Sequence, residues 1–289
     1  QQLLSHADTA CELARSSGGN QIHTHSAVVE EHQGQENEPE RDSVVRKTIE
    51  DERFYLAYQP VVSLKGDTGK RYEVLLRVID EQGHVILPGQ FLSIAEKTGL
   101  IGEIDRWVIK TAFRRLVELR ETDSEALFFI KLSGSTLGNA ELPLWVNDQL
   151  KENRLVGDGI VFEIAEQVVI DDLTNARAFV EAMKTLNCQV AVEHYGNCDQ
   201  PQLLKHLPFD ILKIDGGLIN GLSSNKENQE RVQAILELAT EHDKQTIAEC
   251  VDDAGSLAQL WQYGVDFIQG NFVQEPSKDL EYDFEGEIA

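Results

Sequence analysis

GIVFEIAEQVVIDDLTNARAFVEAMKTLNCQVAVEHY, residues 159–195, has the pattern from which the fold of this chain follows. It begins with an apolar run over 159–166 and ends with another over 189–195, both rich in β-branched and aromatic residues. Runs of this length and composition are typical of buried strands. Between them, residues 175–187 repeat apolar side chains with helical spacing. A strand, a helix and a second strand in this order predict a βαβ unit with two parallel strands.

The same alternation continues through most of the chain after residue 50. Eight candidate strands can be read: FYLAYQPVVSL, YEVLLRVI, ALFFIKLS, GIVFEIAE, QVAVEHY, DILKID, QTIAECV and DFIQG. Helical periodicity also occurs over 105–121, 228–243 and 253–264. Eight strands alternating with helices over about 240 residues favour a closed barrel. The first two strands are joined by LKGDTGKR, which is too short for a helix. We therefore predict the α/β class, a modified TIM (β/α)8 barrel with an antiparallel first strand.

The segment before the barrel has a different composition. Residues 27–43, AVVEEHQGQENEPERDS, are rich in Glu and Gln and have almost nothing to bury. We interpret residues 27–48 as a solvated linker, irregular or helical, that leads into a barrel domain over residues 49–289. Gln1 is neither a Met nor part of a leader-like segment, so we expect an excised piece of a longer protein.

Charge and cysteine usage limit the class of ligand. The chain has 50 Asp+Glu against 26 Lys+Arg, a formal net charge of −24. Such a surface repels nucleic-acid polymers and anionic membranes, so a phosphate-bearing ligand must be held by a few local cations. No apolar stretch approaches the ~18 residues of a membrane span, and no membrane insertion is expected. The four cysteines lack CxxC spacing, which favours a reducing cytoplasm and no zinc site.

Polar side chains follow the apolar runs in strand after strand. In a barrel of this kind the carboxyl ends of the strands meet at one mouth, where such enzymes keep their chemistry. A single acidic residue at a strand end is most often only solvated, but its repetition favours a site. Several carboxylates there would repel one another unless metal ions or a lysine lay between them. The residues at these positions are Glu163, Glu193, His194, Lys213, Asp215, Glu249 and Gln269.

Ordered motifs resemble those of EAL domains, which are cyclic di-GMP phosphodiesterases built on a barrel with an antiparallel first strand. The resemblance covers about residues 50–276. Its motifs are YEVLLR at 72–77, FEIAE at 162–166, LPFDILKID at 207–215, AECVDD at 248–253 and VDFIQGNFVQEP at 265–276. Residues 3–25 resemble the closing helix and strand of a GGDEF domain. We therefore expect residues 1–26 to be the C-terminal remnant of an upstream GGDEF-like domain.

The resemblance implies a two-metal site, and its chemistry depends on positions that this chain only partly retains. Two metals about 3.5–4 Å apart generate a hydroxide and stabilise displacement at a phosphodiester. Glu73, Glu163 and Glu249 stand where the family has metal-binding glutamates, and Lys213 is also in place. These four positions agree with an active member.

Three other positions of the implied metal site are altered. Lys131 stands where an asparagine is expected, and Glu193 and His194 replace two adjacent aspartates. A protonated lysine has no lone pair for Mg²⁺, although its ammonium can neutralise the remaining carboxylates. Glu193 is one methylene longer than aspartate, in a site that tolerates about 0.5 Å. We expect no catalytic residue and no catalytic metal cofactor, only remnants of a metal site: Glu73, Lys131, Glu163, Glu193, His194 and Lys213.

Positions that contact the nucleotide are mostly retained. The family places a phosphate-binding guanidinium at Arg77, for which a surface salt bridge is the alternative. Asp105 can accept hydrogen bonds from N1 and N2 of guanine, and it is also a candidate N-cap of the helix DRWVIKTAF. The expected cyclic di-GMP-binding residues are Gln59, Leu75, Arg77, Asp105, Glu249, Gln269 and Pro276.

Within the family, EVL, QPVVSL and GNFVQEP resemble the FimX-type receptors, which bind cyclic di-GMP without hydrolysing it. This implies an inactive receptor that signals to the type IV pilus and twitching motility through a PilZ-domain partner, in the cytoplasm at the cell pole. Whether the domain forms a homodimer is left open. There are two alternatives to an inactive receptor. One is a weak phosphodiesterase, since His and Glu can both bind Mn²⁺, and the other is a protein-docking module without nucleotide binding.

Overall fold

A computed structural model describes most of the chain. No helix in this part is both long and apolar enough to cross a membrane. The three cysteines within it, Cys188, Cys198 and Cys250, are free thiols. The described residues are 38–79, 83–86, 88–198 and 206–286.

The chain divides into two compact units, residues 1–47 and 48–289. The remnant predicted at 1–26 lies outside the described residues. So does the predicted linker up to residue 37. The rest of that linker belongs to helix α3 (Glu38–Glu50), in agreement with its helical alternative.

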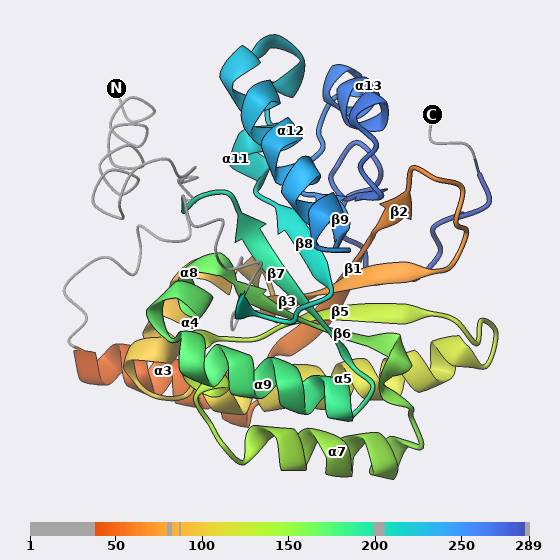
Figure 1. The fold of residues 1–289 in the computed structure, drawn as a ribbon. Helices are drawn as coiled ribbons and strands as arrows, with labels where there is room; N and C mark the ends of the chain where they lie inside the picture. Colours follow the sequence, from red (N-terminus) through yellow and green to blue (C-terminus); the bar gives the residue numbers. More distant parts are fainter. Residues whose placement is uncertain (1–37, 80–82, 87, 199–205, 287–289) are drawn as a thin grey trace. The chain divides into compact units, whose positions relative to one another are not determined.

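The second unit is built on one curved sheet (Figure 1), whose strand order is β1-β3-β5-β6-β7-β8-β9-β10-β2, with β4 paired to β3. The two ends of this order, β1 and β2, are consecutive parts of the predicted first strand, so the sheet closes where they meet. The strands are β1 (Phe54–Pro60), β2 (Val62–Ser63), β3 (Arg71–Ile79), β4 (Val85–Ile86), β5 (Leu127–Lys131), β6 (Ile160–Ala165), β7 (Gln189–Tyr195), β8 (Ile211–Ile214), β9 (Gln245–Ala248) and β10 (Phe267–Ile268).

Strand directions confirm the predicted fold class. β1 is antiparallel to β3, with Phe54 opposite Val78 and Pro60 opposite Tyr72. β2 is likewise antiparallel to β10. The pairs from β3 through β5, β6, β7, β8 and β9 to β10 are all parallel. The structure is therefore a TIM-type barrel with one antiparallel strand.

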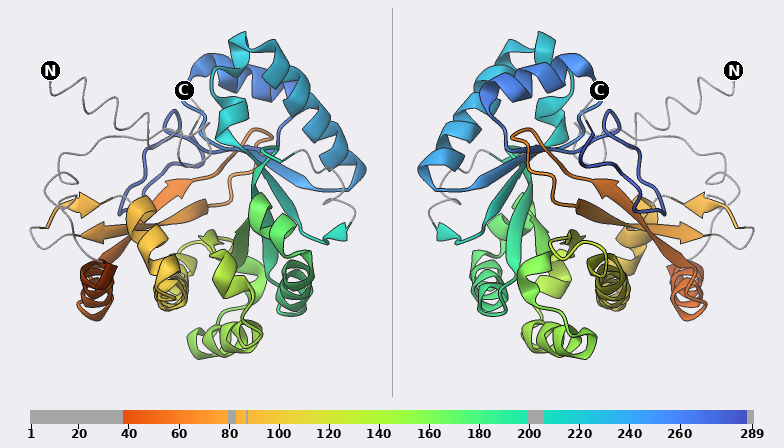
Figure 2. Two further views of the ribbon diagram at one scale, coloured as in Figure 1. Left: turned by 90° about the vertical axis from the view of Figure 1, so that its left-hand side faces the viewer. Right: turned by 90° about the vertical axis from the view of Figure 1, so that its right-hand side faces the viewer.

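Helices lie outside the sheet (Figure 2), as the connections between parallel strands require. The four predicted helices correspond to α5, α9, α12 and α13. The helices of the second unit are α4 (Pro88–Lys97), α5 (Ile101–Arg120), α6 (Gly134–Leu137), α7 (Leu142–Asn153), α8 (Glu166–Asp171), α9 (Leu173–Thr185), α11 (Gly216–Ile219), α12 (Lys226–Glu241) and α13 (Ala254–Tyr263), with short 3-10 turns η1 (Gly157–Gly159) and η2 (Leu222–Ser224).

An apolar layer of side chains fills the barrel. All members of the layer are buried. Val61 lies between β1 and β2, and each other strand of the barrel except β3 contributes one residue. On β3, the Arg71 guanidinium lies 4.9 Å from the centre of the Phe267 ring. This apolar layer, which keeps water out of the barrel below the polar positions, consists of Val61, Phe129, Val161, Ala191, Ile211, Ile247 and Phe267.

Candidate functional site

A ring of polar side chains lies next to the apolar layer. Each member stands two residues along its strand from an apolar-layer residue, or from Arg71 on β3, so the two-residue period of a strand points it into the barrel. All members are buried except the lysine on β5, whose side chain is 37% exposed. This polar ring consists of Gln59, Glu73, Lys131, Glu163, Glu193, Lys213, Glu249 and Gln269.

Lys213 is the buried cation of the polar ring. Its Nζ lies 2.7 Å from Glu73 Oε2, 2.7 Å from Glu163 Oε1 and 3.2 Å from Glu249 Oε1. An ammonium has three N–H donors, so these three carboxylates use all of them. Lys213 thus joins β8 to three other strands and offsets the repulsion among their acids.

Lys131 is the second cation of the ring. Its Nζ lies 2.9 Å from Glu73 Oε1 and 3.5 Å from Glu163 Oε2, and it also donates to Glu193 Oε2. One oxygen from each of these three carboxylates lies within 4.8 Å of the others, a spacing suited to a metal ion. The ammonium of Lys131 is paired with all three of these acids.

Burial and the neighbouring charges shift the pKa values of the carboxyl groups in the ring. Burial raises the pKa of Glu73, but Lys131 and Lys213 outweigh burial and leave that pKa well below its usual range. Burial, together with repulsion from Glu73, raises the pKa of Glu163 to about 7. For Glu249, burial is outweighed by Lys213 and His194, which lower the pKa to about 2.

His194 stands at an irregularity of β7. Its φ is 56°, and the pairing of β7 with β8 shifts register between Val192 and Tyr195. A bulge of this kind changes the direction of a side chain. The His194 Nδ1 lies 3.2 Å from Glu249 Oε2 and 3.4 Å from Asp215 Oδ2. These two carboxylates raise the pKa of His194 to about 10, so the imidazole is charged at neutral pH.

Two glutamines complete the polar ring at the seam between β10 and β1. Gln269 Nε2 donates to Gln59 Oε1 at 2.9 Å, and Gln59 Nε2 donates to the carbonyl of Gln274 at 3.1 Å. Gln269 is 5% exposed, and its Oε1 accepts no hydrogen bond from any residue that the structure describes. This seam therefore contains a buried acceptor without a partner among the described residues.

Leu75 and Arg77 continue the inward face of β3 beyond Glu73, and both are half-buried. Arg77 Nη1 donates to the Leu76 carbonyl at 2.9 Å. Within the described residues, no carboxylate forms an ion pair with Arg77, so the surface salt bridge considered above is not formed there. Pro276 is half-buried next to Ser277, which pairs with Tyr58 of β1.

Asp105 corrects one prediction. Helix α5 begins at Ile101 with Leu100 as its N-cap, so Asp105 lies inside the helix and the N-cap interpretation was wrong. The carboxylate is buried, and its Oδ2 accepts from the backbone N–H of Ser133 at 3.1 Å and from its hydroxyl at 2.6 Å. Its contact with guanine stays a prediction.

Two further acids lie at the site: Asp215, which was read above as a strand-end residue, and Glu166, which was not singled out. Asp215 contacts His194 and also accepts from the backbone N–H of Gly217, at the start of α11. Glu166 is buried, and its Oε2 accepts from the backbone N–H groups of Gly196 and Cys198, just after β7. Each is the last residue of a strand motif read above, DILKID or GIVFEIAE, so the strand-end signal that found Asp215 applies to Glu166 as well.

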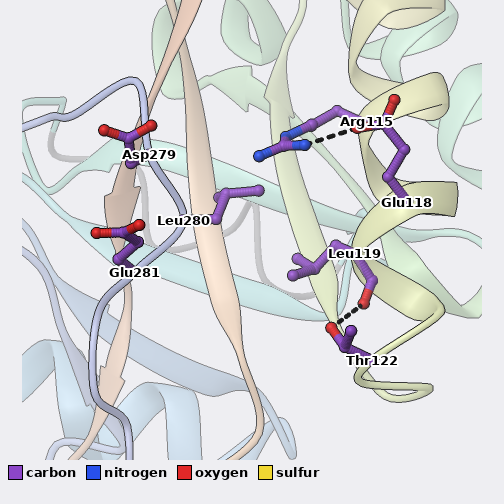
Figure 3. A pocket seen from close by; sticks show the side chains of 7 residues that line it. All are labelled: Arg115, Glu118, Leu119, Thr122, Asp279, Leu280 and Glu281. Carbon is purple, nitrogen blue, oxygen red and sulfur yellow. Dashed lines mark hydrogen bonds and ion pairs between the residues drawn. The ribbon is translucent and has the colours of Figure 1, made fainter.

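A cavity of about 210 Å³ is bounded by the last turns of α5 and by the segment after Lys278 (Figure 3). Helix α5 leads into the amino end of β5, whereas Lys131 stands at the carboxyl end of that strand. No member of the polar ring lines the cavity, whose residues are Arg115, Glu118, Leu119, Thr122, Asp279, Leu280 and Glu281.

Comparisons with known proteins agree with this architecture. The FimX EAL domain of Pseudomonas aeruginosa, solved with c-di-GMP bound, is 36% identical with a TM-score of 0.80, and the match covers 84% of this chain and 99% of that one. The FimX EAL domain of Xanthomonas citri in complex with c-di-GMP is 30% identical, with a TM-score of 0.79 and coverage of 86% and 98%.

Among curated sequences, cyclic di-GMP phosphodiesterase PdeB of Shewanella oneidensis is 29% identical over 100% of this chain and 34% of its own length. The cyclic di-GMP phosphodiesterase PdeF of Escherichia coli is 28% identical over 82% of this chain and 30% of its own. The chain thus spans about a third of the length of these relatives. The EAL domain family matches residues 42–276, and the chain belongs to that family.

Proposed function

We propose that this chain is a receptor domain that binds cyclic di-GMP and does not hydrolyse it. The position of Lys131 carries the proposal. Its ammonium is paired with Glu73, Glu163 and Glu193, the acids that could together hold one metal ion. A divalent ion would have to displace this charged group, and a lysine ammonium cannot itself bind the ion.

The second set of acids fits a metal no better. Glu193, His194 and Glu249 also lie within ligand distance of one another. A metal binds the neutral imidazole, whereas the surrounding carboxylates favour the protonated ring of His194. Two-metal hydrolysis needs both ions to activate water and to stabilise the displacement. The residues present do not fit that pair of metals, and we derive no hydrolytic step through them.

Nucleotide binding is supported by features outside the acid cluster. The FimX EAL domains of Pseudomonas aeruginosa and Xanthomonas citri, which this chain resembles, were solved with c-di-GMP. Arg77 offers a guanidinium suited to a phosphate, and the buried Gln269 Oε1 can accept a guanine N–H. Gln59, Leu75, Glu249 and Pro276 complete the proposed contacts, with Asp105 as a further acceptor.

One experiment tests the proposal and its two alternatives. Cyclic di-GMP is titrated calorimetrically with EDTA and with excess Mg²⁺ or Mn²⁺, and the nucleotide is then analysed by chromatography. We expect saturable binding in EDTA and no linear product in either metal. Product formation would support the weak phosphodiesterase. No binding under any condition would favour the protein-docking module.

A variant that reverses the three altered positions tests the assignment of the site. Lys131→Asn, Glu193→Asp and His194→Asp together remove both substituted cations and shorten one carboxylate. Mn²⁺ uptake by this triple variant, beyond that of the wild type, is the expected result. Equal uptake by the two proteins would mean that these side chains do not replace a metal site.

The readout of binding is proposed from the FimX resemblance alone. A PilZ-domain protein would recognise the domain with different affinity in its bound and free forms, since coupling between two ligands is reciprocal. Titration of such a protein with and without cyclic di-GMP measures this coupling. The proposed setting, type IV pilus assembly and twitching motility from the cytoplasmic side of the cell pole, is checked by fluorescence microscopy of the tagged protein.

A further inference from the structure

At the barrel mouth, the glutamate side chains of the polar ring are more deeply buried than the side chains of Lys131 and His194. The side chains of Glu73, Glu163, Glu193 and Glu249 are all at most 8% exposed. The side chain of Lys131 is 37% exposed, and that of His194 is 51% exposed. These four glutamates are therefore covered, and the accessible side chains beside them are Lys131 and His194.

Lys131 also retains hydrogen-bonding capacity that Lys213 lacks. Two N–H groups of Lys131 are directed to Glu73 and Glu193, while its Glu163 contact, at 3.5 Å, is too long for a good hydrogen bond. Lys213 is fully buried and has three carboxylate oxygens within 3.2 Å. Of the two lysines, only Lys131 can donate to a molecule arriving from solvent.

His194 lies beside this donor. Its Nε2 is 3.7 Å from Glu193 Oε2, the same oxygen that accepts from Lys131. In a chain of net charge −24, an accessible ammonium with a free N–H donor is a favourable place for an anionic phosphodiester.

We propose that Lys131 binds the nucleotide directly, donating its third N–H to a phosphodiester oxygen of cyclic di-GMP, with the exposed imidazole of His194 beside it. The inference rests on the proposed function and names the group that meets the phosphate. Lys131 then has two roles, since it neutralises the acids on its inner side and binds the ligand on its outer side.

The test compares Lys131→Met with a matched control. Lys184→Met removes a lysine of similar exposure, 41%, whose Nζ lies 3.1 Å from Asp210 Oδ1 outside the polar ring. Lys131→Met alone leaves acids facing one another without a cation between them. We therefore also measure a paired variant, Lys131→Met/Glu193→Gln, which removes one charge of each sign. Each protein is titrated with cyclic di-GMP in EDTA, at low and at high salt.

We expect Lys131→Met and the paired variant to bind about 10- to 100-fold more weakly, the effect of losing a charge-assisted hydrogen bond. Their affinity should also depend less on salt than that of the wild type. Lys184→Met should bind like the wild type. Wild-type affinity in the paired variant would overturn the inference and leave the proposed function standing. No binding by the wild type would overturn the proposed function and the inference together.

Discussion

The apolar layer and the polar ring stand two residues apart on the same strands, and they differ in what they require of their neighbours. A residue of the apolar layer needs only a neighbour of suitable volume, and a small change of volume costs little. A residue of the polar ring needs a partner of opposite charge, because an unpaired buried charge costs several kcal/mol. Four carboxylates share two ammoniums in the ring, so each lysine supports several strands at once.

Lys213→Met should have the largest effect of all. It removes a fully buried cation whose Nζ lies 2.7 Å from Glu163 Oε1 and 3.2 Å from Glu249 Oε1. We expect the free energy of unfolding to fall by about 3–5 kcal/mol, the cost of breaking a buried pair. Urea denaturation measures the change, with Lys184→Met as the control. A loss below about 1 kcal/mol would show that the ring does not support the barrel.

Removing an acid together with this cation should recover part of the loss. Lys213→Met/Glu163→Gln leaves one less unpaired carboxylate beside Glu73. Residues in one such network couple by about 0.5–3 kcal/mol. In the same urea experiment, the loss of stability in the double variant should therefore be smaller, by about 0.5–3 kcal/mol, than the sum of the losses in Lys213→Met and Glu163→Gln. Simple additivity of the two single changes would argue against a shared network.

A change within the apolar layer should be milder. Ile247 is fully buried, and Ile247→Val removes one methylene without any polar consequence. We expect a loss of about 0.5–1.5 kcal/mol in the free energy of unfolding and unchanged affinity for cyclic di-GMP. A loss as large as that of Lys213→Met would remove the distinction between the two layers.

The smallest expected effect concerns His194 and pH. Its pKa is about 10 in the folded protein, against an ordinary value of about 6.5. A raised pKa contributes stability that is complete below pH 6.5 and is lost as pH rises through 10. The stability difference between wild type and His194→Gln should therefore shrink over this range. Because the side chain is half-exposed, solvent screening keeps the effect modest. Thermal unfolding at several pH values measures it, and a constant difference would contradict the assigned charge.

The strands and most ring positions could be predicted because both follow from a local pattern. Apolar runs with β-branched residues identified all eight barrel strands, and the polar residues after those runs identified five ring members, Glu163, Glu193, Lys213, Glu249 and Gln269. Glu73 is different, since it lies near the start of β3. Strand β3 continues beyond the polar ring and pairs with β4 at Val78 and Ile79. The carboxyl end of β3 therefore does not mark the position of its ring residue.

Other features depend on tertiary contacts that no local pattern encodes. Helix α7 buries only a narrow stripe, Leu142, Val146 and Leu150 with Gln149, so its periodicity was too weak to predict a helix. The start of α5 at Ile101, four residues before the predicted one, placed Asp105 against Ser133 instead of at an N-cap. The positive φ of His194 depends on a register shift against β8, which sequence spacing cannot reveal.

The most direct test of the central claim is the ratio of two dissociation constants for cyclic di-GMP, one measured calorimetrically in EDTA and the other in excess Mn²⁺. If the ammonium of Lys131 takes the place of a metal among Glu73, Glu163 and Glu193, the two constants should agree and the ratio should be close to one. Binding that appears only with Mn²⁺ would contradict this account, because it would mean that the acids hold a metal after all.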